Sequence, residues 1–311
     1  MGKKDVQTID YLKAKHRFAD MFNAVLFQGN QIVKPEQLED VDKEINAPWI
    51  QDGTRVIRDN IQKWHQDTLY TILVIENQEM IDYHMVIRVM LAEALEYHRQ
   101  WKELSKRHKQ DKDLIGGHEF ISGMKKEDRF TPVVTLVVYL GEDKWDASRD
   151  LWGMLQMNEK MKHLVNNYQL KIFDYHDIDD FSNFHSELKQ LFQFMRYSSN
   201  EHDLKKLIAE HSEEYYNVDI DTIHMITTLT NASDIVEQFF IDEGKADRDM
   251  CKGLEEWAAT ERAEGRAEIL EKVNELNIIL VETGRLDDLV KAAKDSAFQN
   301  QLFEEFGLSK A

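Results

Sequence analysis

The sequence predicts an α/β protein, with a mixed sheet flanked by helices and a mostly helical C-terminal region. Two nearly continuous apolar runs, at residues 71–75 and 132–140, have the composition of strands buried on both faces. Segments whose apolar residues recur at helical spacing lie before and between these runs, and beyond residue 180 only helical patterns remain. With 3 prolines and 13 glycines in 311 residues, few breaks interrupt the helices.

The first helix is expected over residues 10–28, and a polar stretch that contains Pro35 and Pro48 follows it. One face of this helix carries apolar side chains at three- and four-residue spacing. These side chains are Phe18, Met21, Phe22, Val25 and Leu26.

Two strand-like runs come next, TRVIRDNIQKWH at 54–65 and LYTILVIENQ at 69–78. The short polar link around Gln66 and Asp67 predicts that they form a hairpin. A helix is expected from about Tyr83 to Lys109. Further strands are expected in PVVTLVVYLG, 132–141, and YQLKIFDYH, 168–176. A helix, two paired strands, a helix and a strand in this order predict an α/β unit with a mixed sheet.

Three regions are expected along the chain: an α/β domain at 1–178, a helical region at 179–249 and an acidic helical tail at 250–311. Apolar side chains with helical spacing occur within residues 184–195 and 220–229. The tail has its own stripe, made by Ile269, Val273, Leu276 and Leu280. We interpret the tail as a packing or oligomerisation helix, which would allow a homo-oligomer to form through the C-terminal helices.

Composition and net charge argue against several classes of protein. The formal charge of −19 argues against a surface that binds nucleic acid everywhere, although a local basic groove or a metal ion could still meet phosphate. No run approaches the roughly 18 apolar residues of a membrane helix, and MGKKDVQTID lacks the apolar core of a signal peptide. The single cysteine, Cys251, excludes an internal disulfide and a cysteine-rich zinc site. We therefore expect a cytoplasmic protein without a membrane partner.

A polar cluster ends the second strand of the predicted hairpin. Glu76, Asn77 and Gln78 follow the apolar run directly, and alternation puts Glu76 and Gln78 on one face. In an antiparallel pair, Asp59 of the first strand can approach Glu76. Oxygen ligands without sulfur or histidine suit Mg²⁺ or Mn²⁺. The alternative is that Asp59 and Glu76 are separately solvated residues at strand ends, and spacing alone favours that alternative.

These segments resemble a known family. An acidic residue on one strand, Glu-x-Gln at the end of the next and then a helix resemble the PD-(D/E)XK nuclease arrangement. The residues HRFADMFNAVLFQGNQIVKPEQLEDVDKE, IRDNIQKWHQDTLYTILVIENQ, MVIRVMLAEALEY and RFTPVVTLVVYLGEDKWDASRDLWGML are more specifically similar to the recombination-promoting nuclease (Rpn), putative-transposase family. The resemblance covers about residues 10–165, and MCKGLEEW in the tail also fits. It implies a restriction-endonuclease-like fold.

The resemblance also implies a set of site residues. Asp59 and Glu76 match the carboxylates that bind the metal, and the main-chain carbonyl of Asn77 is expected as a third oxygen ligand. Gln78 stands where many nucleases of this fold carry lysine. Asp20, in FADMFN, matches an acidic residue expected on the first helix.

Two positions of the predicted helix 83–109 bear on activity. Arg88, in MVIRVM, matches an arginine that faces the site. The family usually has tyrosine four residues later, where this chain has Ala92, so the role of that tyrosine is absent or passes to another residue such as Tyr97.

The activity that the resemblance implies is that of a Mg²⁺-dependent DNA endonuclease, with Mn²⁺ as an alternative ion, linked to DNA recombination or mobile elements. A rival interpretation is a catalytically weakened DNA-binding or regulatory protein that keeps the fold. Ala92 and the charge of −19 favour the rival, whereas Asp59, Glu76 and Gln78 favour the enzyme.

The basic stretch RQWKELSKRHKQDK, 99–112, suits phosphate contact, and an ordinary solvated helix end explains it equally well. Its candidate DNA-binding residues are Arg99, Lys102, Lys106, Arg107 and Lys109. A second motif, DYHDIDD at 174–180, could hold a metal through Asp174, His176 and Asp177. A strand end that leads into a helix N-cap at Asp179 or Asp180 is the favoured interpretation.

Overall fold

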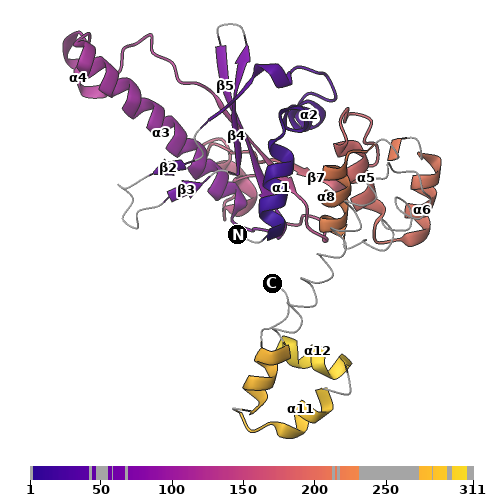
Figure 1. The fold of residues 1–311 in the computed structure, drawn as a ribbon. Coiled ribbons are helices and arrows are strands. Elements are labelled where there is room, and N and C mark those ends of the chain that lie inside the picture. Colours follow the sequence, from indigo (N-terminus) through magenta and orange to yellow (C-terminus); the bar gives the residue numbers. More distant parts are fainter. Residues whose placement is uncertain are drawn as a thin grey trace. The chain divides into compact units, whose positions relative to one another are not determined.

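A five-stranded mixed sheet in the order β1-β4-β5-β6-β7 forms the centre of the first part of the chain (Figure 1). The computed structural model describes residues 3–41, 44–46, 55–57, 59–66, 69–211, 214–215, 218–230, 273–281, 283–292 and 296–306. The strands of the sheet are β1 (Leu38–Asp40), β4 (Asn60–Gln66), β5 (Leu69–Gln78), β6 (Val133–Tyr139) and β7 (Lys171–Asp174). The predicted α/β class with a mixed sheet is confirmed.

The predicted hairpin is present as the antiparallel pair β4–β5, in which Asn60 lies opposite Ile75 and Gln66 opposite Leu69. The predicted strand at 54–65 is divided, because its first residues form β3 (Arg55–Ile57), which pairs with β2 (Glu44–Asn46) in a separate two-stranded sheet. Strand β1, within the polar stretch after the first helical pattern, pairs antiparallel with β4. The sequence did not predict this edge strand, because three residues are too few to show a periodicity.

Strands β5, β6 and β7 are parallel, and helix α3 (Met85–Asp111) forms the crossover between β5 and β6. Gln78, Tyr139 and Asp174 end these strands and lie side by side in register. The strand predicted at 132–141 is confirmed as β6. The strand predicted at 168–176 is present as the shorter β7, followed by the 3₁₀ helix η4 (Tyr175–Asp177).

Helices cover both faces of the sheet. Helix α3 packs on one face, where Met85, Val86 and Val89 join a cluster with Val137 and Tyr139 of β6. Helix α1 (Lys3–Lys13) lies on the other face: the amide of Asn60 donates to the carbonyl of Ile9 at 2.9 Å, and that of Gln62 donates to the carbonyl of Lys13 at 3.2 Å. Both amides are buried, so these bonds satisfy polar groups that burial would otherwise destabilise.

The single helix predicted at 10–28 is two helices, α1 and α2 (Lys15–Leu26), which meet at Ala14. The chain breaks there because Ala14 has an extended ψ of 123°. Buried side chains of α2 include Phe18, Met21 and Phe22, as the spacing predicts.

The first compact unit spans Met1–Ala232 and so includes most of the region that the sequence separates at residue 179. Helices α5 (Leu188–Tyr197), α6 (Glu201–Glu210) and α8 (Ile220–Thr230) belong to this unit. Buried Asp20 of α2 anchors the segment before α5, because it accepts hydrogen bonds from the backbone N–H of His185 and from the backbone N–H and hydroxyl of Ser186. Three short 3₁₀ helices complete the unit: η1 (Pro35–Gln37), η2 (Trp152–Met154) and η3 (Glu159–Met161).

The second compact unit spans Ser233–Ala311. Its described helices are residues 273–281, α11 (Leu286–Ala292) and α12 (Ser296–Glu305). Leu276 and Leu280 of the predicted stripe are buried within this unit, in a cluster with Ala292 and Leu302. Ile269 and Cys251 lie outside the described residues. Oligomerisation through these helices stays a prediction.

A buried histidine holds the far end of α3. Helix α3 extends beyond the sheet, and α4 (Gly116–Ser122) lies at its far end (Figure 1). His108 Nδ1 lies 2.8 Å from Asp113 Oδ1, and its Nε2 lies 2.9 Å from Asp128 Oδ2. A neutral imidazole has only one N–H, so two carboxylate partners favour the imidazolium form. The hydrogen bond to Asp113 is the main cause of the raised pKa of His108, and burial acts in the opposite direction.

This clamp predicts a pH dependence of stability. Because the pKa of His108 is raised in the folded state, its contribution is complete below the unfolded value of about 6.5 and is lost as the pH rises through the folded pKa. Between pH 6 and pH 9, the melting temperature of the parent should fall more steeply than that of His108→Gln. Thermal melting followed by tryptophan fluorescence measures this difference. The exposed His163 supplies the control, since His163→Gln should keep the parental slope. Equal slopes for parent and His108→Gln would contradict the prediction.

Candidate active site at the end of strand β5

One edge of the sheet collects the polar strand ends. The carboxyl ends of the parallel strands β5, β6 and β7 meet there, and in open α/β sheets such edges are where ligands bind. The segments after β5 and β6 are in close contact at this edge. The backbone N–H of Leu140 donates to the carbonyl of Gln78 at 2.8 Å, and a Cβ at Gly141 would lie 2.5 Å from the carbonyl oxygen of Glu79. Only glycine therefore allows this approach.

Asp59 and Glu76 come together at this edge. Asn60 lies opposite Ile75, so the preceding residue, Asp59, reaches the level of Glu76. Asp59 Oδ2 accepts a hydrogen bond from the backbone N–H of Asn77 at 2.9 Å. This bond fixes the carboxylate of Asp59 against the β5 backbone, next to Glu76. Asp59 and Glu76 are therefore neighbours across the hairpin and not two separate strand ends.

Glu76 is a buried carboxylate at 7% exposure with a nearby cation. Arg88 Nη2 lies 4.0 Å from Glu76 Oε2, and Arg88 Nη1 donates to Asp82 Oδ2 at 2.9 Å. Asp82, which the sequence analysis did not single out, thus orients Arg88 towards Glu76. Because the side chain of Arg88 is 46% exposed, its guanidinium is also accessible to an incoming anion.

Gln78 contacts the backbone of Asn77 directly. Its Nε2 donates to the carbonyl oxygen of Asn77 at 2.7 Å, which is the oxygen expected as a third metal ligand. A carbonyl oxygen has two lone pairs, so it can accept this bond and still face a cation. Gln78 is half-buried, and its side-chain oxygen adds a second polar atom to the edge.

The donor set fits a hard cation. Asp59, Glu76 and the carbonyl of Asn77 offer oxygen atoms only, as Mg²⁺ and Mn²⁺ prefer. Across the described part of the chain, no group of three or more His, Cys, Asp and Glu side chains is arranged to hold a metal. Mg²⁺ commonly binds through one or two carboxylates and keeps several waters, so a pair of carboxylates is sufficient.

Comparison with known proteins gives one match. The model of a family described as "Putative transposase, YhgA-like" matches residues 56–220, just over half of the chain. The chain belongs to this family. The family resemblance found in the sequence is thus confirmed. Membership of this family indicates a function connected with mobile DNA. No curated protein and no solved structure shows significant similarity to the chain.

The family match begins after Asp20, whose hydrogen bonds are to the segment before α5. These hydrogen bonds give Asp20 a role in holding that segment against α2. A carboxyl from a different helix lies near the site, because Asp5 of α1 is within hydrogen-bonding reach of Glu79, which follows Gln78. Burial is the main cause of the raised pKa of Glu79; the charge of nearby Lys4 lowers it, and Asp5 raises it. A helix expected from residue 10 could not include Asp5.

Ala92, at the tyrosine position of the family, and Tyr97, its possible substitute, both contribute to packing or to the hydrogen bonds of the fold. Ala92 is buried in α3. Tyr97 cannot replace the tyrosine of the family, because its hydroxyl accepts a hydrogen bond from the backbone N–H of Val133 at 3.1 Å. Val133 begins β6, so Tyr97 lies at the end of the sheet opposite Glu76.

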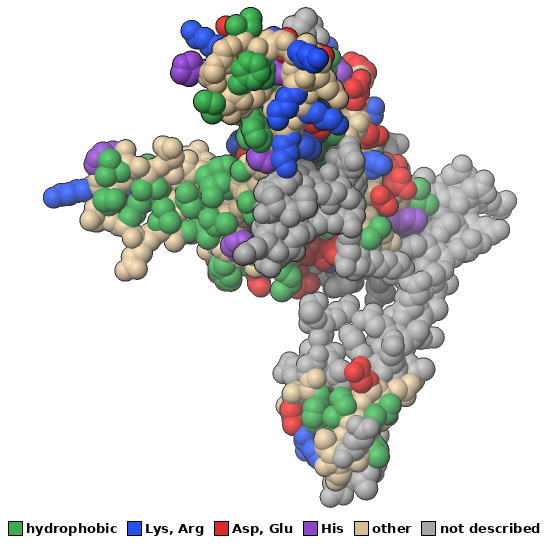
Figure 2. All heavy atoms as spheres, turned by 90° about the vertical axis from the view of Figure 1, so that its left-hand side faces the viewer, with side chains coloured by type: hydrophobic (Ala, Val, Ile, Leu, Met, Phe, Trp, Pro, Cys, Tyr) green, Lys and Arg blue, Asp and Glu red, His purple; other side chains and the backbone are tan. Residues whose placement is uncertain are grey.

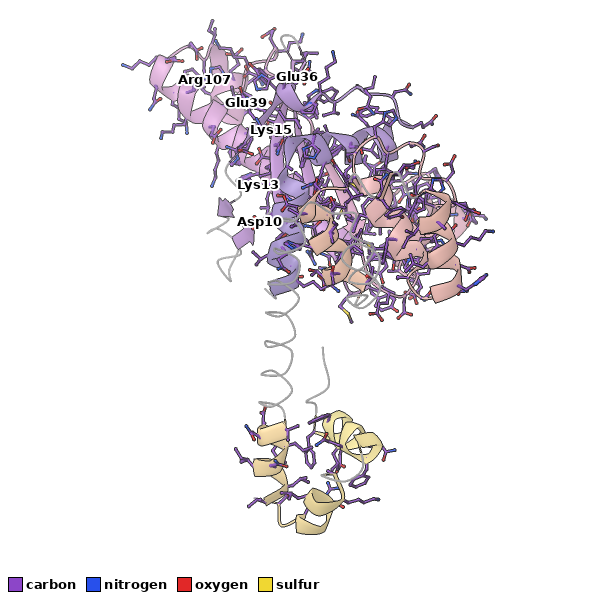
Figure 3. All side chains as sticks on the ribbon, turned by 45° about the vertical axis from the view of Figure 1, so that its right-hand side comes forward. Asp10, Lys13, Lys15, Glu36, Glu39 and Arg107 are labelled. Carbon is purple, nitrogen blue, oxygen red and sulfur yellow. The ribbon has the colours of Figure 1, made fainter. Side chains whose placement is uncertain are left out.

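The basic stretch of α3 divides into paired and exposed cations. Arg99 donates to both Glu96 and Glu103, and the bond to Glu96 is the main cause of its raised pKa. Lys106, Arg107 and Lys109 are exposed and form no ion pair with any described residue. Lys102 is exposed and does have an interaction partner. Figure 3 shows Arg107 at the far end of α3. In Figure 2, Lys and Arg side chains gather on the upper part of the face towards which α3 projects.

The DYHDIDD motif is structural. Asp174 ends β7 and accepts hydrogen bonds from the backbone N–H groups of Trp145 and His176. Asp177 forms ion pairs with Lys144 and Arg149. The N-cap predicted at Asp179 or Asp180 is wrong for α5, which begins at Leu188; Asp180 instead accepts from the backbone and hydroxyl of Ser182.

A cavity of about 560 Å³ lies elsewhere, between α1, the start of α2 and α8. Its lining includes Asp10, Lys13 and Lys15, which Figure 3 shows along α1 and the start of α2. None of the residues predicted for the site lines this cavity. Its mixture of lysines and carboxylates selects neither anions nor cations.

The contact between Gln78 and Asn77 generates a prediction for catalysis. If this edge cleaves DNA with a bound ion, Gln78→Ala removes a polar group beside the expected ligands but no ligand, so it should lower the single-turnover rate of cleavage about tenfold to a hundredfold while changing the Mg²⁺ midpoint less. Gln78→Lys should keep part of the activity, because lysine has a donor of similar reach. Single-turnover cleavage across a Mg²⁺ titration separates the two effects. A parental rate for Gln78→Ala would reduce Gln78 to a polar strand end.

Proposed function

We propose that this protein is a metal-dependent DNA endonuclease that hydrolyses phosphodiester bonds at the end of β5. The observation that supports this most strongly is the hydrogen bond from Asn77 N–H to Asp59 Oδ2, which holds the carboxylate of Asp59 at the backbone that follows Glu76. Membership of a transposase-like family supports DNA as the partner.

The rigid part of the sheet supports this site. Residues Ile72–Ile75 of β5 are buried between β4 and β6, so the backbone that carries Glu76 and Asn77 is held on both sides. Ligands on such a support keep their geometry better than ligands on a loop. Asp59 and Glu76 would hold the ion together with the Asn77 carbonyl. Mg²⁺, when bound, polarises the scissile phosphate and makes water a stronger nucleophile.

The neighbouring side chains would act on substrate and water. Arg88 has a half-exposed guanidinium near Glu76 and would bind a non-bridging phosphate oxygen. Gln78 can both donate and accept hydrogen bonds, and it would orient the attacking water. It carries no titratable proton, so it cannot itself be the base.

Isosteric changes of the two carboxylates test the proposal. Asp59→Asn keeps an oxygen that can accept from Asn77 N–H, and Glu76→Gln keeps the shape of the buried side chain. Each change removes a negative charge from the proposed ion site, so each should lower Mg²⁺-dependent nicking of plasmid DNA more than about 100-fold.

The control is Glu210→Gln, a change with the same chemistry at an exposed residue of helix α6. It should nick at the parental rate, and all three variants should keep the parental circular dichroism spectrum. Undiminished Mg²⁺-dependent nicking by either Asp59→Asn or Glu76→Gln would reject this site.

The exposed cations of α3 should bind the same DNA. From Arg88 to Lys106 the helix rises about 27 Å, the length of about eight base pairs. Reversal of both Lys106 and Arg107 to Glu should weaken duplex binding at all sequences and reduce the slope of log K against log salt by about two. Fluorescence anisotropy at several salt concentrations measures this slope.

A control that reverses the charge of two other lysines separates the effect of the α3 cations from the effect of net charge. Lys34→Glu with Lys160→Glu makes the same change in net charge at two other exposed lysines. This pair should keep the parental slope to within about half a unit. If both double variants lower the slope equally, α3 has no specific role in phosphate contact.

A second candidate function is DNA binding without efficient cleavage. Ala92 at the tyrosine position of the family supports it, because a side chain that the family has at this site is absent. Duplex binding by the parent without any Mg²⁺- or Mn²⁺-dependent nicking would favour this candidate.

A further inference from the structure

The far end of α3 and the segment after it form an ordered element, held by side-chain contacts, that has no part in the proposed cleavage chemistry. We call residues 99–131 the α3–α4 tip. Four contacts hold it together. Trp101 Nε1 donates to the carbonyl of Ser122 at 2.9 Å, His108 joins Asp113 and Asp128, and Lys125 Nζ lies 2.5 Å from Asp113 Oδ2. A glycine at 123, with φ of +69°, also lets α4 end against α3, since a Cβ there would lie 2.3 Å from Ser105 Oγ.

This element exposes large apolar side chains. Ile115 is 82% exposed, Phe120 is 67% exposed and Ile121 is 88% exposed. Helix α4 has no buried residue, so its apolar side chains do not serve the packing of the described chain. A folded segment that presents Phe and Ile to solvent indicates a surface that something else covers.

The excess of basic residues in the tip favours an anionic partner. Residues 99–131 contain nine Lys or Arg and six Asp or Glu, in a chain of net charge −19. Several of the acids already bind within the tip: Asp113 and Asp128 bind His108, and Glu119 accepts from the backbone N–H of Ile115. Lys106, Arg107 and Lys109 remain exposed to solvent. The tip is therefore complementary to a polyanion, whereas the rest of the chain repels one.

We propose that the α3–α4 tip binds duplex DNA as a wedge: its lysines and Arg107 meet the phosphates, and Phe120 and Ile121 insert at a base step. The proposal rests on DNA being the partner in the proposed function and deepens it. Proteins that kink DNA commonly combine exposed Phe, Leu or Ile side chains with flanking cations, so that apolar contact with unstacked bases adds to phosphate binding. Figure 2 shows hydrophobic side chains among the Lys and Arg side chains on the upper part of the molecule.

The geometry places the wedge away from the site of cleavage. Trp101, which bonds to Ser122 next to Phe120 and Ile121, lies about 20 Å along α3 from Arg88, so a duplex that reaches both would be kinked about six base pairs from the cut. Unstacking at such a kink would unwind the duplex, and this effect can be measured without any cleavage.

Two assays on the full-length protein in EDTA test the wedge. The first is anisotropy with a labelled 40-base-pair duplex. The second is relaxation of a closed circular plasmid by a type IB topoisomerase, which needs no magnesium and reports unwinding as a change in linking number. Phe120→Ser with Ile121→Ser should weaken duplex binding about tenfold with an unchanged salt slope, and it should abolish the change in linking number.

The control is Leu164→Ser, because Leu164 is 67% exposed, like Phe120, and lies outside the tip. It should keep both parental signals, and thermal melting should show that all variants fold. Parental affinity and parental unwinding in the Phe120→Ser, Ile121→Ser variant would overturn the wedge, as would a parent that does not bind duplex DNA.

Other occupants of the tip give different results. If light scattering shows an oligomeric parent and a monomeric Phe120→Ser, Ile121→Ser variant whose DNA binding is intact, a second copy covers the tip and the proposal is wrong. Sedimentation with anionic vesicles that depends on Phe120 and Ile121, without unwinding of DNA, would also reject it. If the parent unwinds DNA but never cleaves it, the wedge is supported and the proposed nuclease activity is rejected. If the parent cleaves DNA without unwinding it, the nuclease is supported and the wedge is rejected.

Discussion

In the β4–β5 hairpin, Asn60 lies opposite Ile75, and this register carries Asp59 to the backbone N–H of Asn77. A slip of one residue would turn every side chain of one strand to the other face. The core prevents such a slip, because Ile61 and Val74 share the face covered by α3, whereas Asn60 and Gln62 bond to α1 on the opposite face. The packing of an apolar face thus fixes the register that places Asp59 beside the end of β5.

Among the buried carboxylates of the described residues, Asp20 and Asp174 differ in their surroundings from Glu76. Asp20 and Asp174 accept several backbone N–H groups and so stabilise the segments before α5 and after β7. Glu76 is buried at the end of β5, where the guanidinium of Arg88 lies 4.0 Å from its carboxylate and further interactions hold it. Burial of a carboxylate destabilises a fold unless charge or hydrogen bonds compensate for it. A cation at Glu76 would supply such compensation, which links the electrostatics of the edge to the proposed chemistry.

Helix α3 connects the proposed site at the end of β5 with the α3–α4 tip. Its first turns pack on the sheet and carry Arg88, and its last turns carry Lys106, Arg107 and Lys109. Because a helix is stiff over this length, the separation between site and tip is fixed by the number of residues between them. Net charge describes such a protein poorly, since an acidic chain can still present a basic tip where its local acids are already bound to one another.

The sequence by itself determined the α/β class, the hairpin, the long helix after it and the strand of residues 133–139. Each of these has a periodicity or an apolar run of at least five residues, and such patterns reflect burial directly. It also identified the family through Asp59, Glu76, Gln78 and the motifs around them. Only the tertiary structure decided that Asp5 approaches Glu79, that Asp20 anchors residues 185 and 186, and that Tyr97 caps the far end of β6. These contacts join residues from about 36 to 166 positions apart. In the sequence alone, each of these side chains could equally belong to the site or hold the fold together. The physical reason is that a local pattern specifies which face is buried, whereas the partner of a polar side chain depends on how whole elements pack.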